Sequence, residues 1–142
     1  MLRIDTTAMS LIEGNFDGDP SAHFRANFAL HGGNGSERAA VVIIELEPGE
    51  ALGGHTDSPE EILLVLDGEV EFQVGTETSP AARGTLAVVP PMAPHSIRNI
   101  GTTTARVAGF FPSPTVVATF VEPVQPLGER ILMFGEAAIV AS

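Results

Sequence analysis

Two histidines and two carboxylates lie in the middle of the chain, and their side chains could share one metal ion. His55, Asp57 and Glu61 follow one another at short intervals, and His95 comes directly after a Pro-rich turn. Imidazole nitrogens and carboxylate oxygens bind divalent transition metals, and a set of three or four of them leaves coordination positions free for substrate. We therefore predict one divalent ion here, and the hard oxygen donors favour Fe, Mn, Ni or Zn over Cu(I).

Short runs rich in β-branched and aromatic residues must position these groups, and turn-forming Gly, Pro and Asp residues separate the runs. We predict strands at residues 23–31, 39–47, 61–66, 69–74, 85–89, 94–99, 104–111 and 116–121. Residues 11–22 are predicted to be irregular, Asp67-Gly68 to form a hairpin turn, and 127–140 to form a helix or a last irregular strand. Many short strands at regular spacing are typical of an all-β sandwich or barrel.

Alternation along two of these runs predicts that the candidate ligands face inward. Side chains two residues apart point to the same side of a strand, so Glu61 shares a face with Leu63, and His95 shares one with Ile97 and Asn99. A polar group on an otherwise apolar inward face must be neutralised or hydrogen-bonded. One metal ion would satisfy several such groups at once.

Two segments, residues 49–68 and 84–99, resemble the paired sequence motifs of the cupin superfamily. The first family motif, Gly, five residues, His-x-His, three or four residues, Glu, six residues, Gly, is matched by Gly49, His55, Glu61 and Gly68. The second, Gly, five residues, Pro-x-Gly, two residues, His, three residues, Asn, is matched by Gly84, Pro90, His95 and Asn99. The resemblance implies one all-β cupin domain over residues 1–142, a double-stranded β-helix or jelly-roll barrel.

The sequence departs from the family motifs at two positions. Asp57 stands where the second His of the first motif usually lies, and it is predicted either to bind the metal or to act beside it as a general base. Met92 stands where the second motif has Gly. Either the turn needs no positive φ there, or the Met side chain covers the mouth of the pocket.

The resemblance implies a metal held by His55, Glu61 and His95, with Asp57 as a further ligand. The expected substrate pocket is lined by Leu63, Val65, Phe72, Met92 and Ile97. The expected activity is a metal-dependent, dioxygenase-type oxidation of a small oxygenated organic molecule, with Asp57 and Glu61 as candidate catalytic groups. A lyase, decarboxylase or cyclase, and a non-catalytic module that binds or senses a metabolite, remain alternatives.

The absence of two residue types argues against several cupin activities. There is no tyrosine, on which the cupin deoxysugar epimerases, ectoine synthases and dimethylsulfoniopropionate lyases depend. There is no cysteine, so disulfides, thiolate ligands and the cysteine-crosslinked thiol dioxygenases are excluded. His23 and His31 lie on a predicted early strand and are expected to be structural.

Length and charge indicate the class of partner. The 142 residues suffice for one domain with one core, and the net charge of −11 opposes binding to nucleic acid or to an anionic membrane surface. No apolar run is long enough for a membrane helix, and no signal peptide is visible, so a cytoplasmic protein is expected. The resemblance also implies a homodimer formed by exchange of N-terminal strands, for which residues 1–30 are long enough.

Overall fold

The computed structural model describes residues 1–135, and all of the regular structure in that range is β-strand. The strands are β1 Ile12–Phe16, β2 Asp19–Leu30, β3 Ala40–Leu46, β4 Ala51–Asp57, β5 Glu61–Asp67, β6 Glu69–Val74, β7 Glu77–Ala82, β8 Leu86–Val89, β9 His95–Asn99, β10 Ala105–Phe111, β11 Val116–Gln125 and β12 Glu129–Phe134. The predicted all-β class is confirmed. Within this range no helix is present that could cross a bilayer.

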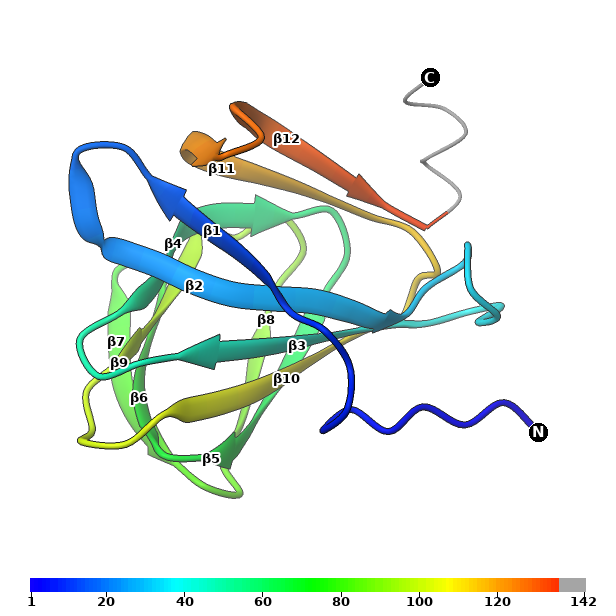
Figure 1. Ribbon diagram of the computed structural model, residues 1–142, viewed down its shortest axis with the longest axis horizontal. Coiled ribbons are helices and arrows are strands. Elements are labelled where there is room, and N and C mark those ends of the chain that lie inside the picture. The colour runs from blue at the N-terminus through cyan, green and yellow to red at the C-terminus, as the bar shows by residue number, and fades with distance from the viewer. Residues whose placement is uncertain (136–142) are drawn as a thin grey trace.

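The strands form one strongly curled antiparallel sheet, which wraps around a central core (Figure 1). Its order is β7-β6-β9-β4-β11-β1-β2-β3-β10-β5-β8, and β12 pairs with β11. Strands β4 and β9 are neighbours in this order, whereas β5 lies near the far end of the sheet. Curling brings β5 back across the barrel, so that residues from both parts of the sheet meet inside.

The inward faces of β5 and β9 carry the residues that alternation predicted. On β5, Glu61, Leu63 and Val65 are buried, while Ile62 is 38% exposed. On β9, Ile97 and Asn99 are buried with His95. Apolar side chains from both parts of the sheet pack around these rows in one main core.

The predicted hairpin at Asp67-Gly68 is wrong. Strand β5 pairs with β8 and β10, and β6 pairs with β7 and β9, so the two strands that flank Gly68 belong to different parts of the sheet. Gly68 has φ of 82°, and a Cβ there would lie 2.9 Å from the Cα of Ala105. The glycine therefore lets the chain turn sharply against β10 and cross the barrel.

Several strands lie where the sequence predicted none. Residues 11–22, predicted to be irregular, contain β1 and the start of β2, and β7 follows the turn at Gly75. The segment 127–140 contributes β12, and its residues 136–140 lie outside the described residues. Within the single chain β1 pairs with β11 and β2, and β2 pairs with β3. Exchange of residues 1–30 in a dimer stays a prediction.

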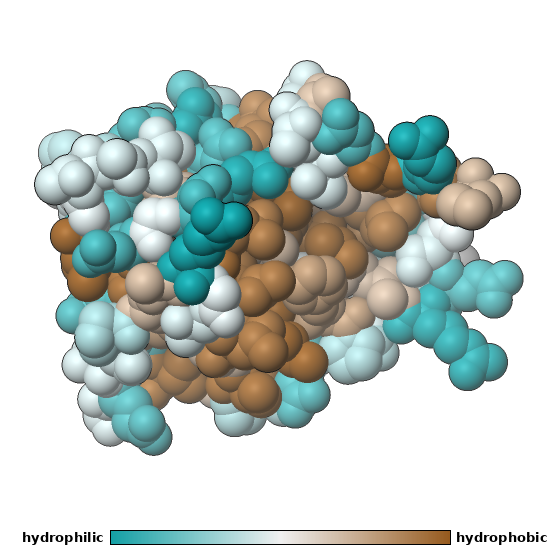
Figure 2. Space-filling model, turned by 90° about the horizontal axis from the view of Figure 1, so that it is seen from below, coloured by the Kyte–Doolittle hydropathy of each residue, from teal (hydrophilic) through white to brown (hydrophobic). Residues whose placement is uncertain are grey.

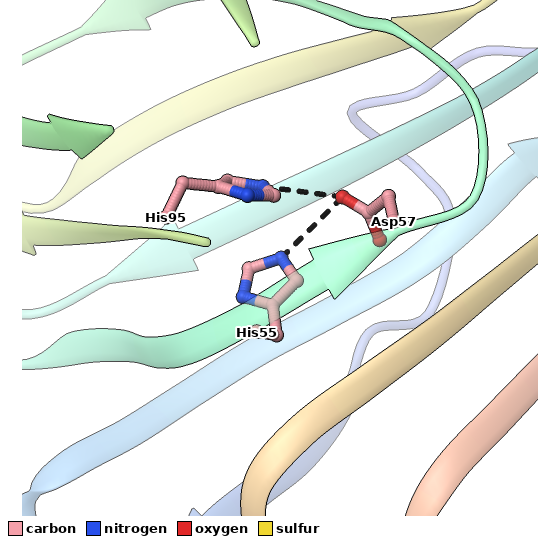
Figure 3. Close-up of side chains that lie close together, drawn as sticks. All are labelled: His55, Asp57 and His95. Carbon is pink, nitrogen blue, oxygen red and sulfur yellow. Dashed lines mark ion pairs between the residues drawn. The ribbon is translucent and has the colours of Figure 1, made fainter. Parts of the chain in front are cut away.

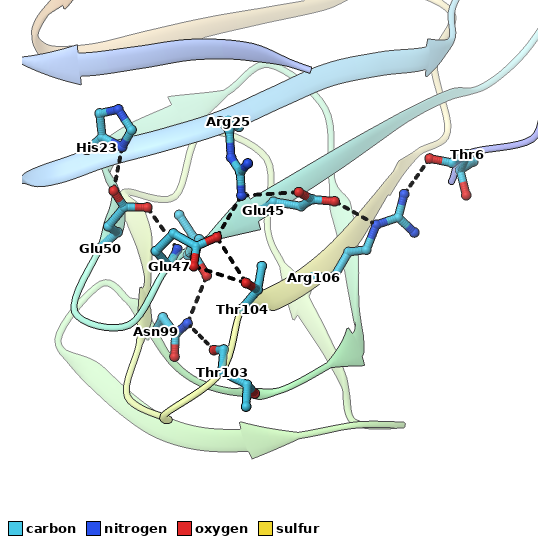
Figure 4. A network of polar contacts seen from close by, with 11 residues as sticks. Thr6, His23, Arg25, Glu45, Glu47, Glu50, Asn99, Thr103, Thr104 and Arg106 are labelled. Carbon is cyan, nitrogen blue, oxygen red and sulfur yellow. Dashed lines mark hydrogen bonds and ion pairs between the residues drawn. The ribbon is translucent and has the colours of Figure 1, made fainter. Parts of the chain in front are cut away.

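A polar network ties the turns at one end of the barrel to its outer face (Figure 4). The Asn99 side chain donates to the carbonyl oxygens of Leu46 and Thr103 at 2.8 Å and accepts from the Gly101 N–H, so this motif residue closes the turn after β9. His23 Nδ1 lies 2.5 Å from a Glu50 carboxylate oxygen. This contact gives His23 a structural partner outside the barrel.

The outer surface of β10, β5 and β8 is apolar. Ile62, Leu86, Val88 and Phe110 are exposed there on neighbouring strands. Figure 2, which views the molecule from below, shows apolar side chains gathered across the middle of that face with polar groups around them. The charged residues of this acidic chain are therefore unevenly spread over its surface.

Candidate metal centre

Strands β4 and β9 bring three of the predicted ligands together inside the barrel (Figure 3). His55 and His95 are directly opposite each other in the register of the two strands, and their ring centroids are 4.1 Å apart. Asp57 comes from the same face of β4, two residues after His55. Its Oδ2 atom lies 3.5 Å from His55 Nε2 and 3.1 Å from His95 Nε2. All three residues are buried.

Backbone carbonyl groups fix the orientation of both imidazole rings. His55 Nδ1–H donates to Gly53 O at 2.8 Å, and His95 Nδ1–H donates to Ala93 O at 2.9 Å. A carbonyl oxygen can only accept, so in each neutral ring the proton is on Nδ1 and the Nε2 lone pair is free. Both lone pairs then point toward the carboxylate of Asp57. In metal-binding histidines the ring is typically fixed in this way, because the nitrogen that does not bind the metal donates a hydrogen bond to the protein.

A cation among these atoms would satisfy a buried oxygen that otherwise has no partner among the described residues. Within residues 1–135, Asp57 Oδ2 is buried and has no hydrogen-bond partner, which is costly for a carboxylate. Ligands about 2.0–2.1 Å from one ion lie about 2.8–3.4 Å from one another, close to the separations seen here. A divalent ion therefore fits these residues by donor type, orientation and spacing.

Glu61 reaches the same centre from β5 on the other side of the barrel. Its Oε1 atom lies 3.2 Å from His95 Nε2, and the carboxylate is buried, but Glu61 is not within mutual ligand distance of all three other groups. Burial and the nearby negative charge of Asp57 raise the pKa of Glu61, against the opposing effect of His95. Glu61 could thus serve as a fourth ligand or hold a proton beside the ion.

The carboxylates strongly perturb the metal-free histidine. Burial by itself lowers the pKa of His95, but the adjacent carboxylates of Asp57 and Glu61 outweigh it and raise that pKa to about 10. Burial likewise opposes ionisation of Asp57, but the close Nε2 atoms of His55 and His95 and the charges of these rings hold its pKa well below the ordinary value. A proton on His95 would therefore compete with a metal cation for this centre.

Three residues outside the predicted site support the centre. Phe120 of β11 stacks on the His55 ring, with centroids 4.8 Å apart and planes inclined by 20°. Gly109 of β10 leaves room for Glu61, because a Cβ there would lie 2.2 Å from Glu61 Oε2. At Gly53, a Cβ would lie 2.3 Å from the ring of Phe16. A glycine within an apolar strand was the available signal, since it indicates close approach of another group.

A cavity of about 120 Å³ adjoins the centre, and its walls differ from the prediction. The predicted lining residues Leu63, Val65, Phe72 and Ile97 are buried in the core, and neither they nor Met92 border this cavity. The walls come mainly from β1, β2, β4 and β11 and include five phenylalanines, namely Phe24, Phe28, Phe111, Phe120 and Phe134. Apart from β4, these strands were not linked to the site because their pairing around the barrel is not encoded by local sequence.

Both interpretations of Met92 are wrong. The residue has φ of 60°, so the turn does need the left-handed conformation that glycine adopts without strain. Its side chain is 57% exposed and does not border the cavity. The Met92 N–H donates to Asp57 O at 2.9 Å, which ties the turn before His95 to the end of β4.

The comparisons with known proteins agree with this geometry. A family model described as "Cupin domain" matches residues 42–111, which include both histidines and both carboxylates of the centre. No curated protein sequence matches the chain.

Solved structures of low sequence identity share the fold. Oxalate decarboxylase from Bacillus subtilis is 19% identical, with a TM-score of 0.65 over 69% of this chain and 28% of that one. The enzyme from Lactobacillus farciminis, solved as a formate complex, is 19% identical, with a TM-score of 0.62 over 78% of this chain and 33% of that one. A putative sugar phosphate isomerase from Acidithiobacillus ferrooxidans is 22% identical, with a TM-score of 0.61 over 92% and 88%.

The chain spans about a third or less of the two decarboxylases, and identities this low carry the fold alone. The fold, the matched segment and the inward-facing motif residues nevertheless agree with one another. Residues 42–111 form a cupin domain, and the chain belongs to the cupin superfamily.

Proposed function

We propose that this protein is a metal-dependent enzyme that acts on a small oxygenated organic substrate. His55, Asp57 and His95 would hold one divalent transition metal ion, with Glu61 beside them. The observation that carries the proposal is the buried Asp57 Oδ2 atom, which has no hydrogen-bond partner in the described residues and faces two Nε2 atoms within 3.5 Å. Fe, Mn, Ni and Zn all suit this mixture of nitrogen and oxygen donors.

A bound ion would polarise a substrate oxygen and stabilise an enolate-like anion. The protein's own residues supply the rest. The carbonyl groups of Gly53 and Ala93 hold the imidazoles in one tautomer, and Phe120 keeps water from one face of His55. The raised pKa of Glu61 suits it to exchange a proton with a substrate hydroxyl group.

A dioxygenase-type oxidation is the activity we favour. Two histidines and one carboxylate, here His55, His95 and Asp57, are the ligand set of many non-haem iron oxygenases, which leave positions open for substrate and oxygen. Decarboxylation is the main alternative, because some structural neighbours are named oxalate decarboxylases. Lyase or cyclase chemistry and metabolite binding without turnover are further alternatives, because each would use the same centre.

The first experiment is metal analysis of the purified protein, followed by turnover assays. We expect close to one transition-metal ion per chain, and oxygen uptake with small enols or phenols when Fe(II) is supplied. The double variant His55→Ala/His95→Ala should lose the metal. The matched control is His23→Ala/His31→Ala, which removes the other two histidines of the chain and should keep it.

Different results point to different alternatives. Protein that stays empty with Fe, Mn, Ni, Zn and Cu contradicts the metal centre. Loaded protein that releases CO₂ or rearranges a substrate without oxygen uptake supports a decarboxylase, lyase or cyclase. Loaded protein that binds a metabolite and turns nothing over supports a binding module.

A further inference from the structure

The walls of the cavity beside the metal centre are almost entirely apolar. Besides its five phenylalanines, the cavity is bordered by aliphatic side chains such as Val42 and Ile44 of β3. The polar residues that border it fall into two groups. His55, Asp57 and Glu61 are buried at the metal centre, whereas Glu13 of β1 and Asn27 of β2 form the outer, more exposed end. A ligand in this space can make polar contacts at its ends and apolar contacts along its body.

The outer end offers little to a polar ligand. The Asn27 side chain already has hydrogen-bond partners within the protein. Its Nδ2 atom donates to Ser10 O at 3.0 Å, and its Oδ1 atom accepts from Phe28 N–H at 2.9 Å. The Glu13 side chain is 70% exposed and stays hydrated. The specific polar contacts of a ligand are therefore confined to the metal end of the cavity.

The charges around the cavity exclude a dianion. When both are ionised, Asp57 and Glu61 together would balance the two positive charges of a divalent ion. No arginine is among the described residues that border the cavity. Arg25 and Arg106 pair with Glu45 on the outer face of the barrel, and Arg98 donates to Gly49 O. A dicarboxylate would bring two negative charges into an apolar space with no further cation, which is costly.

The size of the cavity suits one ring. An apolar cavity of about 150 Å³ is known to hold benzene, and this one measures about 120 Å³ before its side chains adjust. Phenylalanine side chains pack well against the faces and edges of another ring. Phe28 illustrates such packing, since it stacks on Phe134 with centroids 4.2 Å apart and lies 5.9 Å from Phe111.

We propose that the substrate is an uncharged single-ring compound with a phenolic or enolic hydroxyl group, alone or beside a second oxygen, on one edge. The ring lies among the phenylalanines, and the oxygen-bearing edge faces His55, Asp57 and Glu61. This inference rests on the proposed metal centre and adds the substrate class. It also separates this chain from enzymes whose substrate is a small dicarboxylate.

Calorimetric titration of Zn(II)-loaded protein tests the inference without requiring turnover. Catechol is the ring probe and oxalate is the dianion probe. We expect catechol to bind at least about tenfold more tightly than oxalate. Oxalate binding as tight as that of catechol, or no catechol binding to loaded protein, overturns the substrate class.

A cavity-filling variant locates the binding. Ala26 of β2 borders the cavity and is not a candidate ligand, so Ala26→Leu should weaken catechol binding by about tenfold or more while the zinc content is unchanged. Ala82→Leu, at an exposed position of β7, is the matched control and should bind like the wild type. Equal catechol affinity in both variants overturns the placement in the cavity. A wild-type protein that takes up no metal instead refutes the proposed function, and metal analysis distinguishes that failure.

Discussion

Asp57 decides the charge of the centre, because it supplies a carboxylate where the family motif has an imidazole. Its Oδ2 atom lies 3.5 Å from His55 Nε2 and 3.1 Å from His95 Nε2, and within the described residues no donor satisfies it. Together with Glu61 it would leave a divalent centre electrically neutral. This makes ligation the stronger of the two roles predicted for Asp57, and the general-base role the weaker one.

The variant Asp57→Asn separates these roles, because it keeps the shape of the side chain and removes its charge. If Asp57 binds the ion, metal affinity should fall by more than the roughly 10–100-fold typical of losing an outer partner. Metal content and turnover are measured together, with Asp67→Asn at the exposed end of β5 as the control. Retained metal with a rate lowered by about 10²–10⁴-fold would identify a base instead. Retention of both would leave Asp57 without a role.

The raised pKa of His95 predicts how metal binding depends on pH. An incoming ion must displace the proton that His95 holds at neutral pH, so affinity should rise about tenfold per pH unit between about pH 7 and 9 and level off near the pKa of about 10. Metal titrations in weakly buffered indicator solution should also record one proton released per ion. An affinity that does not change over this range would contradict the prediction.

The raised pKa of His95 also makes the stability of the metal-free protein depend on pH, in the opposite direction to metal affinity. The folded-state pKa of His95 lies above its ordinary value of 6.5, so the charged contact stabilises the fold below that pH. This stabilisation is lost as the pH rises through about 10. Thermal unfolding in the presence of a chelator should therefore show the metal-free protein becoming less stable from neutral to alkaline pH.

Met92 is a strained residue that supports the centre from outside. A residue other than glycine at φ of 60° carries a conformational cost of about 1–3 kcal/mol. Met92→Gly should therefore stabilise the protein by up to about 1 kcal/mol, after the greater freedom of glycine in the unfolded chain is counted. Denaturant unfolding measures the change. Met92→Ala keeps the Cβ and should bring no such gain, and equal stability of the two variants would refute strain as the cause.

At the scale of elements, β10 contributes to the centre through Gly109, because the absence of a side chain there leaves room for Glu61. Gly109→Ala would place a Cβ 2.2 Å from Glu61 Oε2 and 2.9 Å from Val42 Cγ1. Because the Glu61 carboxylate is the end of a flexible side chain, it should move, and metal affinity should drop by about 10–100-fold. Metal titration checks this, with Gly54→Ala on β4 as the control because its Cβ would have room. Unchanged affinity in Gly109→Ala would mean that Glu61 does not act on the ion.

The elements also show what the sequence could predict. Regular alternation predicted the inward faces of β5 and β9, because pleating fixes which side chains share a face. Strands β4 and β7 escaped prediction because Gly53-Gly54 and Pro80 weaken any local signal, and long-range pairing with β9, β11 and β6 forms them. Asp67-Gly68 likewise has the local sequence of a hairpin turn, but long-range pairing takes the chain across the barrel there. Motif spacing located the four polar groups, but the cavity walls depend on this pairing.

At the scale of the whole molecule, the centre joins two parts of the sheet that are distant in strand order. His55, Asp57 and His95 come from the neighbours β4 and β9, whereas Glu61 comes from β5 near the far end. An ion bound by all four residues would fasten the barrel across its interior. An ion bound only by His55, Asp57 and His95 would make no bond to β5.

Thermal unfolding should distinguish these cases. Binding to the folded state alone stabilises the protein by about 2.7 kcal/mol when the free ion is at 100 times its dissociation constant. We therefore expect Zn(II) to raise the unfolding midpoint of the wild type in one cooperative transition, and to leave that of His55→Ala/His95→Ala unchanged. Glu61→Gln keeps the other three residues, so at the same Zn(II) concentration its midpoint should rise by less if Glu61 is a ligand, and by the same amount if Glu61 only holds a proton. A wild-type midpoint that does not respond to Zn(II) would show that no ion connects the two parts of the sheet.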